Sequence, residues 1–214
     1  MSILIPCLCE SGLLPDTLSG RLAFRRDCFA RLLSGRQHDM AISATIHKVT
    51  LSVADIDRQY YQDHELTVAM HPSETPFRLM VRLIAFSLNA HEQLVFTKGL
   101  GADDEPELWC KTLSDEIELW VDFGQVDEKR IRKACGRARQ VRVYTYQDRK
   151  AKVWWDQYRQ KLSRHDNLSV FHIVAEGAES LVDRNMQLHC LIDDGAIHLS
   201  DTSNSVSVSV TALE

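Results

Sequence analysis

The chain has 214 residues and a formal net charge of −5, with 44% hydrophobic and 26% charged residues. These values are ordinary for a globular protein, so global disorder is excluded, and the length suits one well-buried domain or at most two small ones. No stretch approaches the run of about 18 apolar residues that a membrane-spanning helix needs, and no positive residues precede the first apolar run as in a secretory signal. We therefore expect a cytoplasmic protein without membrane attachment, whose six cysteines are free thiols.

Residues 1–39 differ in character from the rest of the chain. They contain three of the six cysteines and show neither helical nor strand periodicity, and Met40 then leads directly into a strand-like run. We interpret residues 1–39 as a poorly ordered extension and residues 40–214 as a single domain. A sharper hypothesis is that translation begins at Met40.

Residue periodicity predicts an α/β protein with a mixed sheet. The expected strands span 44–53, 60–70, 94–97, 107–111, 116–123, 141–146 and 168–174, with β-hairpin material over 185–211, and the expected helices span 74–90, 127–139 and 149–162. Ser73 is the candidate N-cap of the first helix and Asp127 that of the second. The strict alternation of residues 205–213 predicts an exposed or edge strand, which would permit strand pairing between subunits.

Charge is segregated in the middle of the chain. Residues 103–128 contain ten acids and one base, whereas residues 129–152 contain ten bases and one acid. This pattern favours a site that holds a cation beside a phosphate, because carboxylates bind Mg²⁺ and basic side chains neutralise a polyanion. Aromatic residues within or just after the basic segment could stack on bases; they are Tyr144, Tyr146, Trp154, Trp155 and Tyr158. The alternative is that the two segments form salt bridges with each other and the aromatic residues fill a core.

Several long segments resemble the YaeQ family. They are HPSETPFRLMVRLIAF, FTKGLGADDEPELW and IELWVDFGQVDEKRIRKACGRA, with similar segments at the start, AISATIHKVTLSVADIDR, and at the end, QLHCLIDDGAIHLSDTSNSVSVSVTALE. The resemblance covers about residues 40–214. It implies a variant of the PD-(D/E)XK nuclease fold, whose core order, helix–strand–strand–strand–helix–strand, is also the order predicted above. The N-terminal strand pair and the C-terminal β-hairpin region would be additions to that core.

The resemblance also implies a site. In PD-(D/E)XK nucleases an acid near the start of the second core strand and another on the third bind Mg²⁺, and an acid on the first helix often contributes. The matching positions here are Asp104 and Asp122 as ligands of Mg²⁺ or Mn²⁺, with Glu74 in support. A bound ion makes its water more acidic and able to attack a phosphodiester. The alternatives are that Asp104 caps a turn, Asp122 ends an edge strand and Glu74 favours a helix N-terminus.

One position departs from the family pattern. A lysine is expected two residues after the second acid, but Gly124 stands there; Gln125 follows it, and Lys133 is a candidate source of the missing positive charge. Two hypotheses remain. The first is a divalent-metal-dependent nuclease, and the second is a non-catalytic regulatory module that binds nucleic acid or a protein partner through the basic segment. The sequence leaves the substrate and the oligomeric state open.

Overall fold

The computed structural model describes residues 44–97 and 104–213. The chain divides into two units, Met1–Ala41 and Ile42–Glu214, and every described residue belongs to the second. The predictions for residues 1–39 and for the translation start lie outside the described residues. No helix in the described part of the chain is long and apolar enough to cross a membrane.

The described residues form a mixed α/β fold whose elements follow the predicted order. The strands are β1 (Thr45–Asp55), β2 (Tyr60–Met70), β3 (Leu94–Phe96), β4 (Leu108–Lys111), β5 (Ile117–Phe123), β6 (Ala138–Thr145), β7 (Leu168–Val174), β8 (Asn185–Asp193), β9 (Ala196–Ser200) and β10 (Ser205–Ala212). The helices are α1 (Pro76–Leu88), α2 (Glu128–Cys135), α3 (Asp148–Leu162) and a short 3-10 helix, η1 (Ala178–Leu181). The run from α1 to β6 has the predicted order of helix, three strands, helix and strand.

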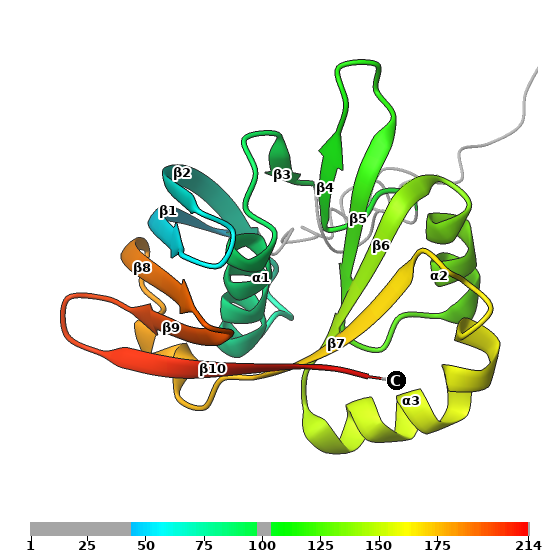
Figure 1. Ribbon diagram of the computed structural model, residues 1–214. Helices are drawn as coiled ribbons and strands as arrows, with labels where there is room; N and C mark the ends of the chain where they lie inside the picture. Colours follow the sequence, from blue (N-terminus) through cyan, green and yellow to red (C-terminus); the bar gives the residue numbers. More distant parts are fainter. Residues whose placement is uncertain (1–43, 98–103, 214) are drawn as a thin grey trace, which may run out of the picture. The chain divides into compact units, whose positions relative to one another are not determined.

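The ten described strands form one sheet in the order β2-β1-β8-β9-β10-β7-β6-β5-β4-β3. Strands β5, β6 and β7 are parallel, whereas β3, β4 and β5 are antiparallel. Strand β10 joins the two halves, because its first half pairs with β9 and its second half with β7 (Figure 1).

Helix α1 lies between the two halves of the sheet (Figure 1). Its buried side chains join those of β1, β8 and β9 on one side and of β4 and β5 on the other in one apolar cluster. Helices α2 and α3 cover the opposite face of β5, β6 and β7, where Trp120 and Trp154 are buried in a second cluster. Strands β5, β6 and β7 are therefore packed on both faces, which is typical of strands in parallel arrangement.

Helix α1 begins two residues later than its sequence pattern indicates. Thr75, and not Ser73, is the N-cap, and its hydroxyl accepts a hydrogen bond from the backbone N–H of Arg78 at 3.2 Å. Glu74 therefore lies in the turn before the helix instead of in its first turn. The Glu74 carboxylate binds the side chains of Arg78 and Arg82 of the helix.

Helix α2 is shorter than predicted. It ends at Cys135, because the N–H of Gly136 closes the last turn on the carbonyl of Arg132 and residues from Ala138 onward pair with β5. Ala138, inside the predicted helix, is instead buried on strand β6. Strand pairing therefore overrides a helical pattern at the end of α2.

The alternating C-terminal segment is a strand, as predicted, but not an outer strand of the sheet. Val206 and Val208 are buried and the serines between them are exposed, which confirms the alternation. The outermost described strands are β2 and β3. The inference that β10 is a sheet edge available to a second subunit is therefore wrong.

Candidate functional site

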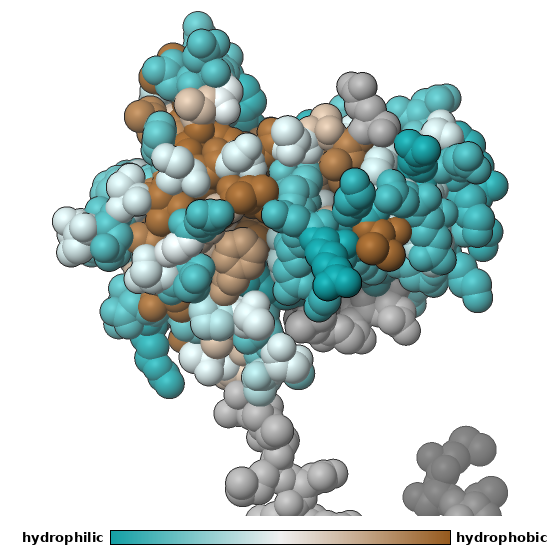
Figure 2. Space-filling view, turned by 90° about the horizontal axis from the view of Figure 1, so that it is seen from below, coloured by the Kyte–Doolittle hydropathy of each residue, from teal (hydrophilic) through white to brown (hydrophobic). Residues whose placement is uncertain are grey.

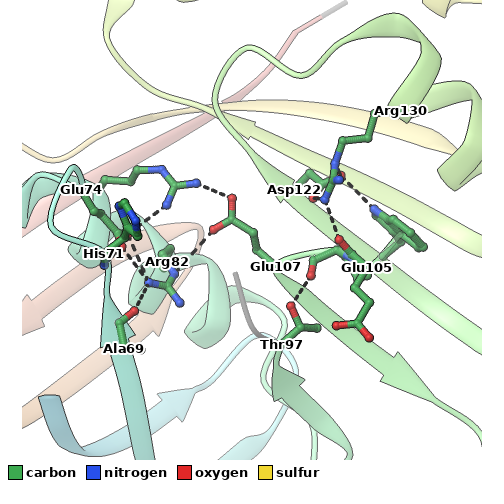
Figure 3. A network of polar contacts seen from close by, with 12 residues as sticks. Ala69, His71, Glu74, Arg82, Thr97, Glu105, Glu107, Asp122 and Arg130 are labelled. Carbon is green, nitrogen blue, oxygen red and sulfur yellow. Dashed lines mark hydrogen bonds and ion pairs between the residues drawn. The ribbon is translucent and has the colours of Figure 1, made fainter. Parts of the chain in front are cut away.

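A network of buried ion pairs lies at the N-terminal end of α1. The Glu74 carboxylate accepts hydrogen bonds from Arg78 at 2.9 Å and from Arg82 at 3.2 Å. Both arginines also face Glu107, which directly precedes β4; Arg78 donates to it, and Nε of Arg82 lies 3.7 Å from its Oε2 (Figure 3). Arg82 also donates to the carbonyl of Ala69 on β2 at 3.0 Å. Two carboxylates and two guanidinium groups thus neutralise each other.

A second buried pair lies on β5. The Asp122 carboxylate accepts two hydrogen bonds from Arg130 of α2, at 2.9 and 2.8 Å, and one from the indole N–H of Trp120 at 2.9 Å (Figure 3). Arg130 also donates to the carbonyl of Glu105 at 2.7 Å. Only 4% of the Asp122 side chain is exposed. Two-point contact with an arginine fixes this carboxylate in orientation.

The Glu107 carboxylate interacts electrostatically both with the arginines that bind Glu74 and with Asp122. Burial raises the pKa of Glu107, Arg78 and Arg82 lower it less, and the negative charge of Asp122 raises it further. Its Oε2 atom is buried and accepts no hydrogen bond among the described residues. A carboxyl group of this kind takes up a proton more readily than an exposed glutamate does.

The other predicted site residues are more exposed. Asp104 has 80% of its side chain exposed and pairs with Lys133 of α2. Gln125 is exposed and its amide donates to the carbonyl of Tyr146 at 3.4 Å. The structure thus brings Asp104 and Lys133 together and places Asp122 against Arg130. It holds Glu74 in the separate network with Arg78 and Arg82.

A divalent metal site needs several ligand side chains close together. Among the described residues no three His, Cys, Asp or Glu side chains are grouped so that they could hold a metal. Both oxygens of Asp122 already bind Arg130, and Asp104 already binds Lys133. A shared ion does not fit these side chains as they stand, so the ligand roles of Asp104 and Asp122 stay predictions.

The backbone accounts for the missing lysine. Gly124 has a φ of +82°, a conformation that L side chains rarely adopt, and its N–H donates to the carbonyl of Tyr144 at 2.9 Å. A Cβ at this position would also contact the ring of Tyr146 at 3.7 Å. A lysine at residue 124 would therefore be strained in this turn.

A basic surface covers the outer sides of α2 and α3. Residues 127–164 contain thirteen Lys and Arg but four Asp and Glu. We define the basic surface by six exposed residues of these helices that form no ion pair with a described carboxylate: Lys129, Arg132, Arg149, Lys150, Lys152 and Arg159. Glu128 of α2 binds Lys161 at 3.1 Å and Arg164 at 2.9 Å, which connects the two helices.

Comparison with known proteins gives a consistent result. Residues 40–210 match the family model described as YaeQ protein. The chain belongs to the YaeQ family. The uncharacterized protein YaeQ of Escherichia coli (strain K12) is 46% identical over 176 residues, which are 81% of this chain and 97% of that protein. Its counterpart from Salmonella typhi is 45% identical over 177 residues, with the same coverage.

Two crystal structures of YaeQ proteins have the same fold. The protein from Xanthomonas axonopodis pv. citri superposes with a TM-score of 0.77 at 39% identity, over 80% of this chain and 99% of that one. The protein from Pseudomonas syringae gives a TM-score of 0.75 at 29% identity, over 80% of this chain and 96% of that one. The match confirms the YaeQ fold for the described domain.

The basic partners of the buried acids in this YaeQ family member were not among the predicted site residues. Arg78 and Arg82 follow Glu74 at intervals of four residues, so one helical face carries both arginines toward it. This spacing could have revealed the pairs. Glu107 gave no local signal, because only the packing of β4 beside α1 places it between the two arginines.

Proposed function

We propose that this protein binds nucleic acid through the basic surface of α2 and α3. The observation that carries the proposal is the local excess of positive charge on two adjacent helices of a chain whose net charge is −5. In Figure 2 the right-hand side of the molecule, where Figure 1 shows α3, is mostly hydrophilic. Exposed lysine and arginine side chains on one face attract the phosphate backbone and release its counterions.

The aromatic residues limit how bases can be read. Tyr144 is buried and stacks on Phe171 with 5.3 Å between ring centroids, and Trp154 is buried with its N–H donated to the carbonyl of Val126. These two rings are part of the core and are not available for stacking on bases. Trp155 and Tyr158, also on α3, are half-buried and remain candidates for stacking on bases. The proposed binding rests first on phosphate contacts, which carry little sequence preference.

A charge-removal variant tests the proposal. We expect the combined substitution K129Q/R132Q/K150Q/K152Q to weaken binding to single- and double-stranded DNA and RNA by about tenfold or more, because four phosphate contacts are lost. Fluorescence anisotropy at low salt measures the affinity. The matched control is K48Q/R184Q, which removes two exposed bases from β1 and the turn before β8 and should bind like the wild type. Absence of binding by the wild type, or an equal loss in the control, would contradict the proposal.

Metal-dependent cleavage on a PD-(D/E)XK-like core is the second candidate, and one observation favours it. Three buried carboxylates belong to the segment before α1, the segment before β4, and β5; they are Glu74, Glu107 and Asp122. Buried charges are costly, and proteins often keep them at functional sites. In the PD-(D/E)XK pattern the acids lie on the first helix, near the start of the second core strand and on the third. Glu74, Glu107 and Asp122 lie at the matching elements here, so Glu107 takes the place predicted for Asp104.

Cleavage assays separate the two candidates. If the protein is a nuclease, Mg²⁺ or Mn²⁺ should stimulate cleavage of a DNA and RNA panel, and D122N and E107Q should each abolish it. If the protein only binds, no cleavage appears and D122N binds with the affinity of the wild type. D104N, at an exposed side chain that pairs with Lys133, shows whether Asp104 also contributes to cleavage as the family pattern predicts.

A further inference from the structure

A polar hollow lies at the C-terminal end of α1, on the face of the sheet that α1 covers. Its volume is about 410 Å³, which is within the usual range of small-molecule sites. Three arginines from different elements line it: Arg58 follows β1, and Arg139 and Arg142 are on β6. Asn89 and His91, directly after α1, add further polar groups to the wall.

Arg142 is the unusual member of this lining. Its half-buried guanidinium donates to the side-chain oxygen of Asn89, whose amide N–H donates to the hydroxyl of Tyr144 at 2.8 Å. Burial raises the pKa of Tyr144, so this hydroxyl stays neutral and adds no negative charge. No carboxylate of the described residues forms an ion pair with Arg142. A partly desolvated cation without a counter-charge is costly for the protein, and a bound anion would offset that cost.

The other two arginines have acidic partners. Arg58 binds Asp55 at 2.6 Å and donates to the carbonyls of Ser87 and Ala90, at 3.1 and 3.4 Å, which holds it against the end of α1. Arg139 binds Glu116 at 2.7 Å and lies 3.7 Å from Glu118. Each guanidinium has five N–H donors, so both retain donors for a ligand.

The remaining wall contributes little negative charge. Cys110 and His91 are in contact, with 3.6 Å between Sγ and Nδ1. Burial and the charge of Glu118 raise the pKa of the Cys110 thiol, which is therefore neutral near pH 7. Glu118 is the one carboxylate among the lining residues, and Arg139 faces it. Arg142 is thus the one arginine of the lining without a carboxylate partner among the described residues, and the hollow is rich in hydrogen-bond donors.

We propose that this hollow binds a small ligand through a phosphate group, with Arg142 as the main anchor and Arg139 at the exposed rim. The guanidinium fork matches the geometry of phosphate oxygens, and the amide of Asn89 fixes its orientation. Ala90, Leu119 and Cys110 form an apolar part of the wall that can contact an organic moiety attached to the phosphate.

This site is independent of the proposed nucleic-acid surface. The hollow lies on the face of the sheet that packs against α1, where Tyr144 belongs to the α1 cluster. The basic surface is on α2 and α3, which cover the opposite face of β5 to β7. We therefore expect a variant that loses binding at one of the two sites to keep binding at the other.

Isothermal titration calorimetry tests the proposal with inorganic phosphate and with a nucleoside monophosphate as probes. We expect saturable one-to-one binding of at least one probe to the wild type. R142Q should weaken it by about tenfold or more, because a charge-assisted contact is lost. R139Q, at a side chain that is 64% exposed, should weaken it several-fold. R184Q, which removes an exposed arginine outside the hollow, should bind like the wild type.

The competing outcomes are distinct. No saturable binding of either probe, unchanged affinity in both R142Q and R139Q, or an equal loss in R184Q would each overturn the proposal. Circular dichroism of R142Q shows whether its fold is intact. If R142Q does not fold, R139Q and R184Q decide the result.

Discussion

Asp122 and Asp104 both bind a basic side chain of α2, yet the two pairs differ in environment. Asp122 is 4% exposed and its partner Arg130 is 25% exposed, whereas Asp104 is 80% exposed. A buried charge depends on its partner, because water cannot replace the lost contacts, whereas a surface pair competes with water and contributes little. The carboxylates that the sequence analysis placed in one metal site therefore have different structural roles.

This difference gives a prediction for stability. Asp122→Ala removes the carboxylate that Arg130 and the Trp120 N–H bind, and it should lower the free energy of unfolding by about 2–4 kcal/mol. Asp104→Ala should change it by less than about 1 kcal/mol. Urea denaturation measures both values. Similar losses in the two variants would contradict the description of Asp122 as a buried structural acid.

Gly124 gives a second prediction at this scale. Gly124→Ala should lower the free energy of unfolding by about 1–2 kcal/mol, because its φ of +82° is unfavourable for any residue with a Cβ. Gly136 is the matched control, since its φ is −80° and an added Cβ would make ordinary contacts, the nearest at 3.6 Å. Gly136→Ala should be neutral or stabilising by up to about 1 kcal/mol. Thermal denaturation of the two variants checks the contrast, and a neutral Gly124→Ala would contradict the strain argument.

At the scale of elements, periodicity predicted the order and the approximate bounds of the elements from β1 to β7, whereas β8, β9 and β10 were predicted only as hairpin material over 185–211. The β10 alternation is a strong local signal, because burial repeats with the period of the strand. The apolar run of α1 is a strong signal of a different kind, since every residue from Leu79 to Ser87 is buried. The place of β10 in the sheet was not predictable, because the sequence alternates in the same way in an edge strand and in a strand that joins two halves of a sheet. The pairs around Glu107 were not predictable either, because they depend on how α1 packs beside β4.

The role of β10 as the junction of the sheet has a measurable consequence. Val208 is buried in the α1 cluster, so Val208→Ala should lower the free energy of unfolding by about 1–3 kcal/mol. The adjacent Ser207 is exposed on the opposite face, and Ser207→Ala should change it by less than about 0.5 kcal/mol. Chemical denaturation compares the two. Equal, small effects would show that β10 does not pack on α1.

At the scale of the whole molecule, the two charged segments partly neutralise each other. Arg130, Lys133 and Arg139 bind acids of the preceding segment, as the salt-bridge alternative in the sequence analysis predicts. The six residues of the basic surface have no such partners among the described residues. The outer sides of α2 and α3 therefore carry positive charge that no nearby carboxylate of the described residues pairs with. The nucleic-acid proposal rests on this charge.

The salt dependence of nucleic-acid binding tests this account most directly. For each phosphate neutralised on double-stranded DNA, the plot of log K against log salt concentration steepens by about 0.9. The account predicts a clearly negative slope for the wild type and a slope shallower by roughly 2–4 for K129Q/R132Q/K150Q/K152Q. An affinity that does not change with salt, or equal slopes for the two proteins, would contradict it.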